Sequence, residues 1–310
     1  MKNRFRVFLT VLLIGGIAMG IVSCRSTPPA ATDTPSPYVA ASSPDHETAS
    51  PGSRYIDYVF EDVAVTEDIP YGKATDYQGQ EQTLLLDIYS PAGDDQKDRP
   101  AIIFVHGGGF TEGDKNGGME TKLGTAFARK GYVCASIDYR LRDETSDWNG
   151  TLLDAVADAH AALQWLIDHS DDYGIDPERI ALSGYSAGAI TVTGLAYNDG
   201  IGLPEITGES VFAVINMAGG AHGLGEISSG APPCLIIHGS EDDVVSFMSG
   251  TQCSEALTAA GVRNTFYVMD GISHDLYNHV PQIEEVMTVF LYEALTGTTP
   301  DMPIGNKSMR

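Results

Sequence analysis

The stretch that decides the fold is RIALSGYSAGAITV, residues 179–192. An apolar, strand-like run leads into the motif GYSAG, and a helix-compatible run follows at once. A serine between two glycines at a strand-to-helix turn is typical of a nucleophile elbow, because side chains at the glycine positions would collide with neighbouring backbone. We therefore predict that Ser186 is a catalytic nucleophile. Outside this context the motif would indicate only a Gly/Ser-rich turn.

Short β-rich segments alternate with longer helical ones around this stretch, which favours a mostly parallel sheet covered by helices on both faces. The first two strands alternate polar and apolar residues around a turn-rich stretch at 77–79, so we expect an antiparallel edge there. We expect one α/β domain over residues 54–297, followed by a flexible tail at 298–310. The predicted strands are 58–66, 83–89, 101–105, 132–137, 180–182, 212–217, 234–237 and 266–269, and the predicted helices are 121–129, 152–169, 187–197, 249–260 and 281–295.

A second motif, HGGGF at residues 106–110, follows the third predicted strand. Three consecutive glycines leave backbone N–H groups free to face a ligand. We expect the N–H groups of Gly108, Gly109 and Ala187 to form an oxyanion hole, which binds the negative oxygen of a tetrahedral intermediate. His106 is expected to support this loop by hydrogen bonding, since the general base should follow the nucleophile in the chain.

Two later strands end in groups that complete a catalytic set. The segment HGSEDDVV, residues 238–245, supplies a carboxylate at Asp242, and the loop after the last predicted strand supplies His274 as the general base. The order Ser186, Asp242, His274 is that of α/β-hydrolases and differs from the orders of the two familiar serine-protease folds. The alternatives for the acid are Glu241 and Asp243, and the weaker candidates for the base are His222, His238 and His279.

The N-terminal region has the pattern of an export signal. Basic residues at positions 2, 4 and 6 precede an apolar run over 7–22 that is shorter than the ~20 residues needed to span a bilayer. The run ends in IVSC, which resembles the bacterial lipobox, and this resemblance implies that Cys24 becomes the lipidated first residue. We expect a signal peptide at 1–23 and a Pro/Ser/Thr-rich, disordered tether at 24–53.

The lipobox resemblance implies a lipid-anchored location in the cell envelope. Because Arg25 and not Asp follows Cys24, we expect the outer membrane or cell surface rather than the inner membrane. The membrane would then be a partner of the chain through its N-terminal lipid. An ordinary signal peptide and an uncleaved anchor are the alternatives, in which Cys24 has no special role.

Charge and cysteine content exclude several classes of protein. Lys plus Arg number 18 and Asp plus Glu number 42, so the formal net charge is −24. Nucleic acid is not an expected partner, because phosphate binding needs clustered positive charge. Four cysteines without CxxC or His/Cys clusters predict neither a metal site nor a disulfide framework, and no cofactor is expected. A single bridge between Cys234 and Cys253 is left open, as is the oligomeric state.

The segment from about residue 84 to residue 295 resembles the α/β-hydrolase esterases of the carboxylesterase and hormone-sensitive-lipase-like branch. The resemblance is carried by HGGGF, by SIDYRL at 136–141, by YGIDPERI at 173–180 and by HGSEDDVV. It is nearest to compact esterases related to feruloyl and acetylxylan esterases. The resemblance implies an eight-stranded α/β-hydrolase fold with the triad named above.

Two departures from the hormone-sensitive-lipase-like pattern bear on the substrate. Tyr185 precedes the nucleophile where those enzymes often carry an acidic residue, and no helical cap precedes the domain. The segment 217–233, where many relatives insert a lid, is short and Gly-rich. We therefore expect a small or absent lid and an open cleft, which suits short acyl groups better than long chains.

The predicted activity is hydrolysis of short-chain carboxylic esters by a serine esterase. The expected substrate is a small molecule or an acetylated or feruloylated polysaccharide. An amide hydrolase such as an arylformamidase or a peptidase is one alternative, because the same residues cleave amides. A tethered binding protein without catalysis is another. The residues that we expect to line the substrate cleft are Phe110, Trp148, Tyr185 and Tyr277.

Overall fold

The computed structural model describes residues 54–143, 147–197, 210–220 and 227–300. The predicted signal peptide, Cys24, the tether, His222 and residues 301–310 lie outside these ranges. All described residues belong to one unit of the chain, which begins at residue 46. No helix among the described residues has both the length and the apolar character needed to cross a membrane.

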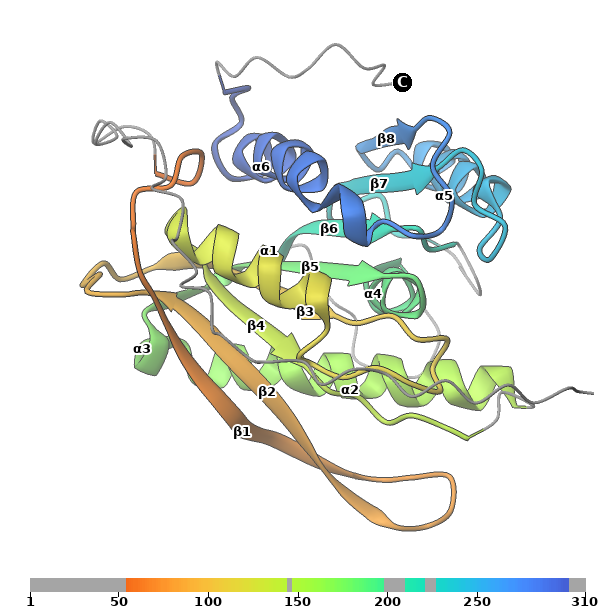
Figure 1. Cartoon of the computed structure of the whole chain (residues 1–310), viewed down its shortest axis with the longest axis horizontal. Coiled ribbons are helices and arrows are strands. Elements are labelled where there is room, and N and C mark those ends of the chain that lie inside the picture. The colour runs from red at the N-terminus through yellow and green to blue at the C-terminus, as the bar shows by residue number, and fades with distance from the viewer. Residues whose placement is uncertain (1–53, 144–146, 198–209, 221–226, 301–310) are drawn as a thin grey trace, which may run out of the picture. The chain divides into compact units, whose positions relative to one another are not determined.

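An eight-stranded sheet forms the centre of the domain, with the order β1-β2-β4-β3-β5-β6-β7-β8 (Figure 1). β2 is antiparallel to both β1 and β4, and the pairings from β4 through β3, β5, β6, β7 and β8 are parallel. This confirms the expected mostly parallel sheet with an antiparallel edge. The strands are β1 (Val63–Thr75), β2 (Glu81–Pro91), β3 (Arg99–Val105), β4 (Val133–Ile137), β5 (Ile175–Tyr185), β6 (Val211–Met217), β7 (Cys234–Gly239) and β8 (Asn264–Met269).

Helices cover both faces of the sheet and bury two apolar layers (Figure 1). One face packs against α1 and α6 through residues such as Phe127 and Met287. The other face packs against α2, α4 and α5 through residues such as Leu163, Val192 and Leu257. The helices are α1 (Gly118–Arg129), α2 (Trp148–Asp168), α3 (Ser170–Tyr173), α4 (Ala187–Tyr197), α5 (Phe247–Ala259) and α6 (Val280–Thr296), with a short 3-10 helix η1 (Tyr277–His279) before α6.

The first strand begins at Val63, five residues later than the sequence predicts. Residues 58–62 instead run beside the end of α1, where the Val59 N–H donates to the Arg129 carbonyl oxygen at 2.9 Å. The Tyr58 hydroxyl donates to Glu284 at 2.7 Å. The turn after β1 lies where the sequence predicts it. The Asp76 side chain stabilises this turn by accepting hydrogen bonds from two of its backbone N–H groups.

Polar residues at the end of β4 and just after it connect the sheet to the glycine-rich loop. Ser136 donates to the Lys115 carbonyl oxygen at 2.6 Å, and Asp138 accepts from the Lys115 N–H at 2.7 Å. Arg140 forms a buried ion pair with Asp158 of α2 at 2.7 Å. A buried pair of this kind is strongly destabilising to break, because the remaining charge is left without a partner. The motif SIDYRL therefore positions residues 106–115 beside the carboxyl ends of the parallel strands.

Candidate active site

Ser186 lies at a sharp turn between β5 and α4, in the left-handed backbone region with φ of 53°. Such a conformation costs a non-glycine residue about 1–3 kcal/mol, so the surrounding structure must hold it. The Ser186 N–H donates to the Met217 carbonyl oxygen at 2.8 Å. A Cβ at Gly184 would come within 2.2 Å of the Gly188 carbonyl oxygen, and one at Gly188 within 2.0 Å of the Val105 carbonyl oxygen. The motif GYSAG is therefore an elbow that requires both glycines.

The structure brings the three predicted catalytic side chains into one hydrogen-bonded chain. His274 Nε2 lies 2.9 Å from Ser186 Oγ, and His274 Nδ1 lies 2.8 Å from Asp242 Oδ2. Because a carboxylate only accepts, Nδ1 carries the proton and Nε2 is free to accept the serine proton. This is the protonation state that a general base needs in order to activate a hydroxyl nucleophile.

Asp242 follows β7 and is held on both carboxylate oxygens. Its Oδ1 accepts from the N–H groups of Val244 and Val245 at 3.0 and 2.9 Å. Its Oδ2 accepts from His274 and also lies 3.2 Å from His238 Nε2. The two alternative acids, Glu241 and Asp243, are exposed on the same loop. The geometry thus favours Asp242 as the acid.

His238 makes a contact with the acid that the sequence did not predict. It is fully buried, and its Nε2 lies 2.8 Å from the Val245 carbonyl oxygen as well as near Asp242. Two acceptors around Nε2 place the ring proton there, and burial lowers the pKa of His238, which favours the neutral ring. His238 is therefore a neutral donor behind the acid. The spacing HGSED, which separates the two residues by four, is the signal that could have revealed it.

The glycine loop after β3 lies against the nucleophile. A Cβ at Gly107 would come within 3.2 Å of Ser186 Cβ, and Gly108, Gly109 and Phe110 all have positive φ. The Gly108 carbonyl oxygen accepts from two N–H groups further along the loop. In the described part of the chain, no hydrogen bond occupies the N–H groups of Gly108, Gly109 or Ala187. They are available to an oxyanion.

His106 supports this loop, as the sequence predicts, and does not contact the serine. Its Nδ1 lies 2.6 Å from the Gly107 carbonyl oxygen, and its ring stacks on Tyr139 at 4.4 Å. The Tyr139 hydroxyl donates to the His106 carbonyl oxygen at 3.0 Å. Burial lowers the pKa of His106, as it does for His238. His279, another weaker candidate for the base, precedes the first turn of α6.

The four aromatic residues expected in the cleft fall into two pairs. Tyr185 is buried, donates its hydroxyl to the His274 carbonyl oxygen at 2.8 Å and stacks on the His274 ring at 5.3 Å. Tyr277 is exposed and contacts the Tyr185 ring edge-on at 5.1 Å. Phe110 is buried and packs edge-on against the exposed Trp148 at 5.2 Å. Tyr277 and Trp148 thus present aromatic surface, whereas Tyr185 holds the histidine loop.

The described cysteines are free thiols. Cys134, Cys234 and Cys253 are all buried, and no bridge joins Cys234 to Cys253, the pair left open by the sequence. Burial raises the pKa of Cys253 to about 12, so this side chain is a thiol under ordinary conditions.

The strand order, the elbow and the chain order of the three side chains are those of the α/β-hydrolase fold, which is the fold of this chain. The family model BD-FAE matches residues 86–201, a segment that includes the glycine loop and the elbow but is less than half of the chain.

Similar curated proteins are esterases. An isoprenylcysteine alpha-carbonyl methylesterase of Arabidopsis thaliana is 25% identical over 72% of this chain and 63% of its own length. Esterase LipC of Mycobacterium tuberculosis is 27% identical over 63% of this chain and 58% of its own length. The chain therefore spans about three-fifths of the length of these relatives.

A similar solved structure is that of a thermophilic esterase from Thermogutta terrifontis, with a TM-score of 0.62 and 25% sequence identity. The match covers 76% of this chain and 94% of that one. The similar proteins found by sequence and by structure are thus named esterases. This supports the assignment of the chain as a carboxylester hydrolase.

Proposed function

We propose that the chain hydrolyses short-chain acyl esters through an acyl-enzyme on Ser186. The observation that carries the proposal is the continuous hydrogen-bonded chain from Ser186 through His274 to Asp242, beside unoccupied N–H groups of the glycine loop. No cofactor has a part in this mechanism.

In the first half-reaction, Ser186 Oγ attacks the ester carbonyl carbon while its proton moves to His274 Nε2. The carbonyl oxygen becomes an oxyanion that accepts from the N–H groups of Gly108, Gly109 and Ala187. The intermediate collapses, the C–O bond to the alcohol breaks, and His274 returns the proton to the leaving oxygen. Asp242 stabilises the transient imidazolium and fixes its orientation.

In the second half-reaction, water replaces the alcohol. His274 takes a proton from this water, whose oxygen attacks the acyl carbon and forms a second oxyanion. The bond to Ser186 Oγ then breaks, the serine regains its proton from the imidazolium, and the carboxylic acid leaves.

Two observations support a short acyl group and a covalent serine intermediate. Thermogutta terrifontis esterase 2 is solved with propionate bound, and it is also phosphorylated by paraoxon, in structures 25% identical to this chain. In this chain the connection from β6 to β7 is only 16 residues long, from residue 218 to residue 233, which leaves little room for a lid.

The direct test combines an acyl series with a covalent probe. The purified chain is assayed on p-nitrophenyl esters from acetate to palmitate, and its mass is measured after incubation with paraoxon. We expect fast turnover on short chains and one phosphoryl adduct, both lost in Ser186→Ala. Ser183→Ala is the matched control, because this buried hydroxyl three residues earlier has no hydrogen-bond partner among the described residues. Turnover that survives in Ser186→Ala would refute the mechanism. A wild-type chain that forms the phosphoryl adduct but hydrolyses none of the esters would favour an amide substrate.

For the natural substrate, we propose an acetylated or feruloylated polysaccharide. The BD-FAE match and the resemblance to feruloyl and acetylxylan esterases support this choice, as does the predicted export of the chain. Acetate or ferulate release from xylan by the wild type but not by Ser186→Ala is the expected result. An absence of release, with p-nitrophenyl ester turnover intact, would leave a small-molecule ester as the substrate.

We also propose that Cys24 carries the lipid that anchors the enzyme in the cell envelope. The support is the basic head, the short apolar run and the cysteine that ends it. Metabolic labelling with an alkyne fatty acid in a bacterial host is expected to mark the wild type and not Cys24→Ser. A labelled Cys24→Ser chain, or an unlabelled wild type, would contradict the anchor.

A further inference from the structure

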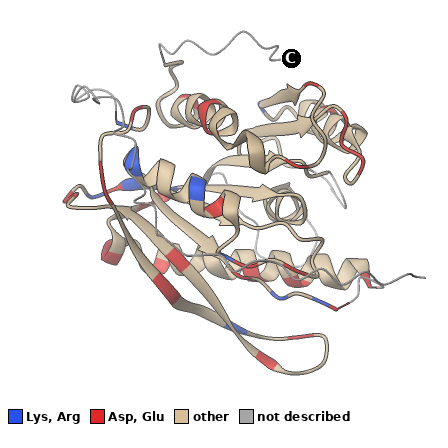
Figure 2. Ribbon diagram, in the orientation of Figure 1, with Lys and Arg blue, Asp and Glu red and all other residues tan. Residues whose placement is uncertain are grey.

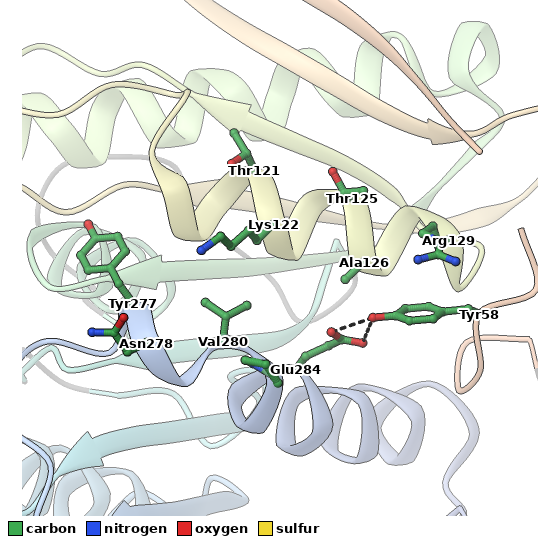
Figure 3. A pocket seen from close by; sticks show the side chains of 11 residues that line it. Tyr58, Thr121, Lys122, Thr125, Ala126, Arg129, Tyr277, Asn278, Val280 and Glu284 are labelled. Atoms are coloured by element: carbon green, nitrogen blue, oxygen red, sulfur yellow. Dashed lines mark hydrogen bonds between the residues drawn. The ribbon is translucent and has the colours of Figure 1, made fainter. Parts of the chain in front are cut away.

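A groove lies between α1 and α6, beside the proposed active site. Its volume is about 670 Å³ (Figure 3). Tyr58 closes one end, from the segment before β1, and Tyr277 lies at the other end (Figure 3). Side chains of α1, among them Lys122 and Arg129, line one wall, and side chains of η1 and α6, among them Asn278 and Glu284, line the other.

The groove carries positive charge on a strongly acidic chain. Lys122 and Arg129 are seven residues apart on α1, which is about two helical turns or ~10 Å, and both point into the groove (Figure 3). Within the residues that the structure describes, neither of them pairs with a carboxylate. The α1 helix accordingly shows blue segments in a molecule whose net charge is −24 (Figure 2).

The one carboxylate that lines the groove is already occupied. Glu284 pairs with Lys130 at 3.1 Å and accepts the Tyr58 hydroxyl at 2.7 Å. The Arg129 guanidinium stacks over the Tyr58 ring at 4.3 Å and uses its Nε to donate to the Phe60 carbonyl oxygen. Its terminal nitrogens therefore remain available, as does the exposed ammonium of Lys122.

Two aromatic rings separate the groove from the catalytic histidine. Tyr277 lines the groove and contacts Tyr185, and Tyr185 stacks on His274 and donates to its carbonyl oxygen. A molecule seated in the groove would thus extend away from the reacting ester along α1.

We propose that this groove binds a carboxylated segment of the polysaccharide whose acyl groups the enzyme removes. The inference rests on the proposed function and adds to it the substrate class, an acidic rather than a neutral glycan. Lys122 and Arg129 would bind two carboxylates along the chain, Thr121, Thr125 and Asn278 would bind hydroxyl groups, and Tyr277 would offer a ring face to a sugar.

The test uses Ser186→Ala, so that binding is measured without turnover. Its affinity is determined by calorimetry for glucuronoxylan and for the same xylan after carboxyl reduction. We expect tighter binding of the acidic form, and a loss of about two- to fivefold for each of Lys122→Ala and Arg129→Ala. Salt should weaken only the binding of the acidic form. Lys97→Ala, which removes an exposed ammonium elsewhere, and Arg179→Ala, which removes an exposed guanidinium that pairs with Asp176, are the controls and should change neither affinity.

A second variant keeps the charges and fills the groove. Thr125 is exposed, so Thr125→Trp should fold normally, which thermal unfolding checks, and should weaken binding of both xylans. Equal affinity for the two xylans, losses no larger than in the controls, or binding to anionic phospholipid vesicles instead of xylan would overturn the proposal. Acidic-xylan binding by a chain that fails on every ester would refute the proposed function and leave the groove assignment standing.

Discussion

A His-Gly pair directly follows β3 and another one ends β7, and the two histidines support different halves of the site. His106 bonds to its own glycine loop, whereas His238 bonds to the acid of the triad. Both rings are buried, and burial lowers the pKa of both. The two rings differ in the nitrogen that makes the contact. Nδ1 of His106 faces the Gly107 carbonyl oxygen, whereas Nε2 of His238 faces the Asp242 carboxylate. The comparison teaches that the same dipeptide at the same place on a sheet acquires its role from its tertiary partner.

The largest effect is expected for the third histidine, His274, which alone touches the nucleophile. His274→Ala should lower kcat on p-nitrophenyl acetate by about 10⁴-fold or more, because the serine then has no base. His160→Gln on α2 is the control, since that ring has no contact with the site, and it should leave kcat unchanged. If His274→Ala kept most of the activity, one of the two buried histidines would have to be the base.

A smaller loss, of about 10³- to 10⁴-fold in kcat, is expected for Asp242→Asn. The amide can no longer orient and stabilise the His274 imidazolium. Asp243→Asn, which changes the exposed neighbour, should be close to wild type. Equal losses in the two variants would show that kcat depends on the conformation of the loop and not on the Asp242 carboxylate.

The comparison itself is tested by His238→Leu, which removes the donor behind the acid. A hydrogen bond to a charged group is worth about 1.5–3 kcal/mol, so we expect kcat to fall by about tenfold to a hundredfold with KM little changed. His238→Gln, which keeps an N–H donor, should recover part of the loss.

Coupling to the acid separates the two histidines. In an Asp242→Asn background the effect of His238→Leu should disappear, whereas any effect of His106→Leu should persist. Equal coupling of both histidines to Asp242 would mean that they act only on the stability of the sheet edge.

The smallest expected effect is on the pH dependence of the free energy of unfolding. The two histidines should contribute to it in the same direction. The pKa of each is lowered in the folded chain from its ordinary value of 6.5. Between 6.5 and the folded value the unfolded chain binds the proton and the folded chain does not, so the free energy of unfolding falls as pH decreases through that window. Below the folded value this contribution is constant.

Urea unfolding at pH 7.5 and 5.5 measures this loss. It should be smaller in His106→Leu and in His238→Leu than in the wild type. The raised pKa values of Glu120 and Asp158 act in the opposite sense, but they are common to all three chains and cancel in the difference. Burial also raises the pKa of Asp138, and His106 partly offsets that rise, so the contribution of Asp138 cancels only for His238→Leu. A pH dependence unchanged in both variants would contradict the buried neutral state.

The sequence predicted those parts of the molecule that depend on local patterns. The buried parallel strands are continuous apolar runs, and the elbow and the glycine loop need glycine for steric reasons that can be seen in the motif itself. Asp242 and His274 could be placed because strand ends in a parallel sheet meet at one edge. In the structure the two side chains lie within hydrogen-bonding distance of each other, and His274 also lies within reach of Ser186.

The sequence did not predict features that depend on contacts between residues far apart in the chain. The segment 58–62 has a strand-like pattern, but its partners are Arg129 and Glu284 on two helices, so it lies outside the sheet. β5 begins at Ile175, five residues before the predicted strand, in a polar stretch that includes a proline. The contact of His238 with the acid and that of Tyr185 with His274 both need the folded sheet. No local pattern encodes them.

The three buried thiols have a consequence for handling the protein. Only a thiolate attacks a disulfide, and burial raises the pKa of Cys134, Cys234 and Cys253, so the folded domain resists oxidative cross-linking. Once unfolded, the same residues have ordinary reactivity, with a pKa of about 8.5. Heating in air at alkaline pH should thus trap the chain in non-native disulfides, while a reductant should restore refolding. The fold, and not the absence of cysteine, is thus expected to protect the domain from oxidation.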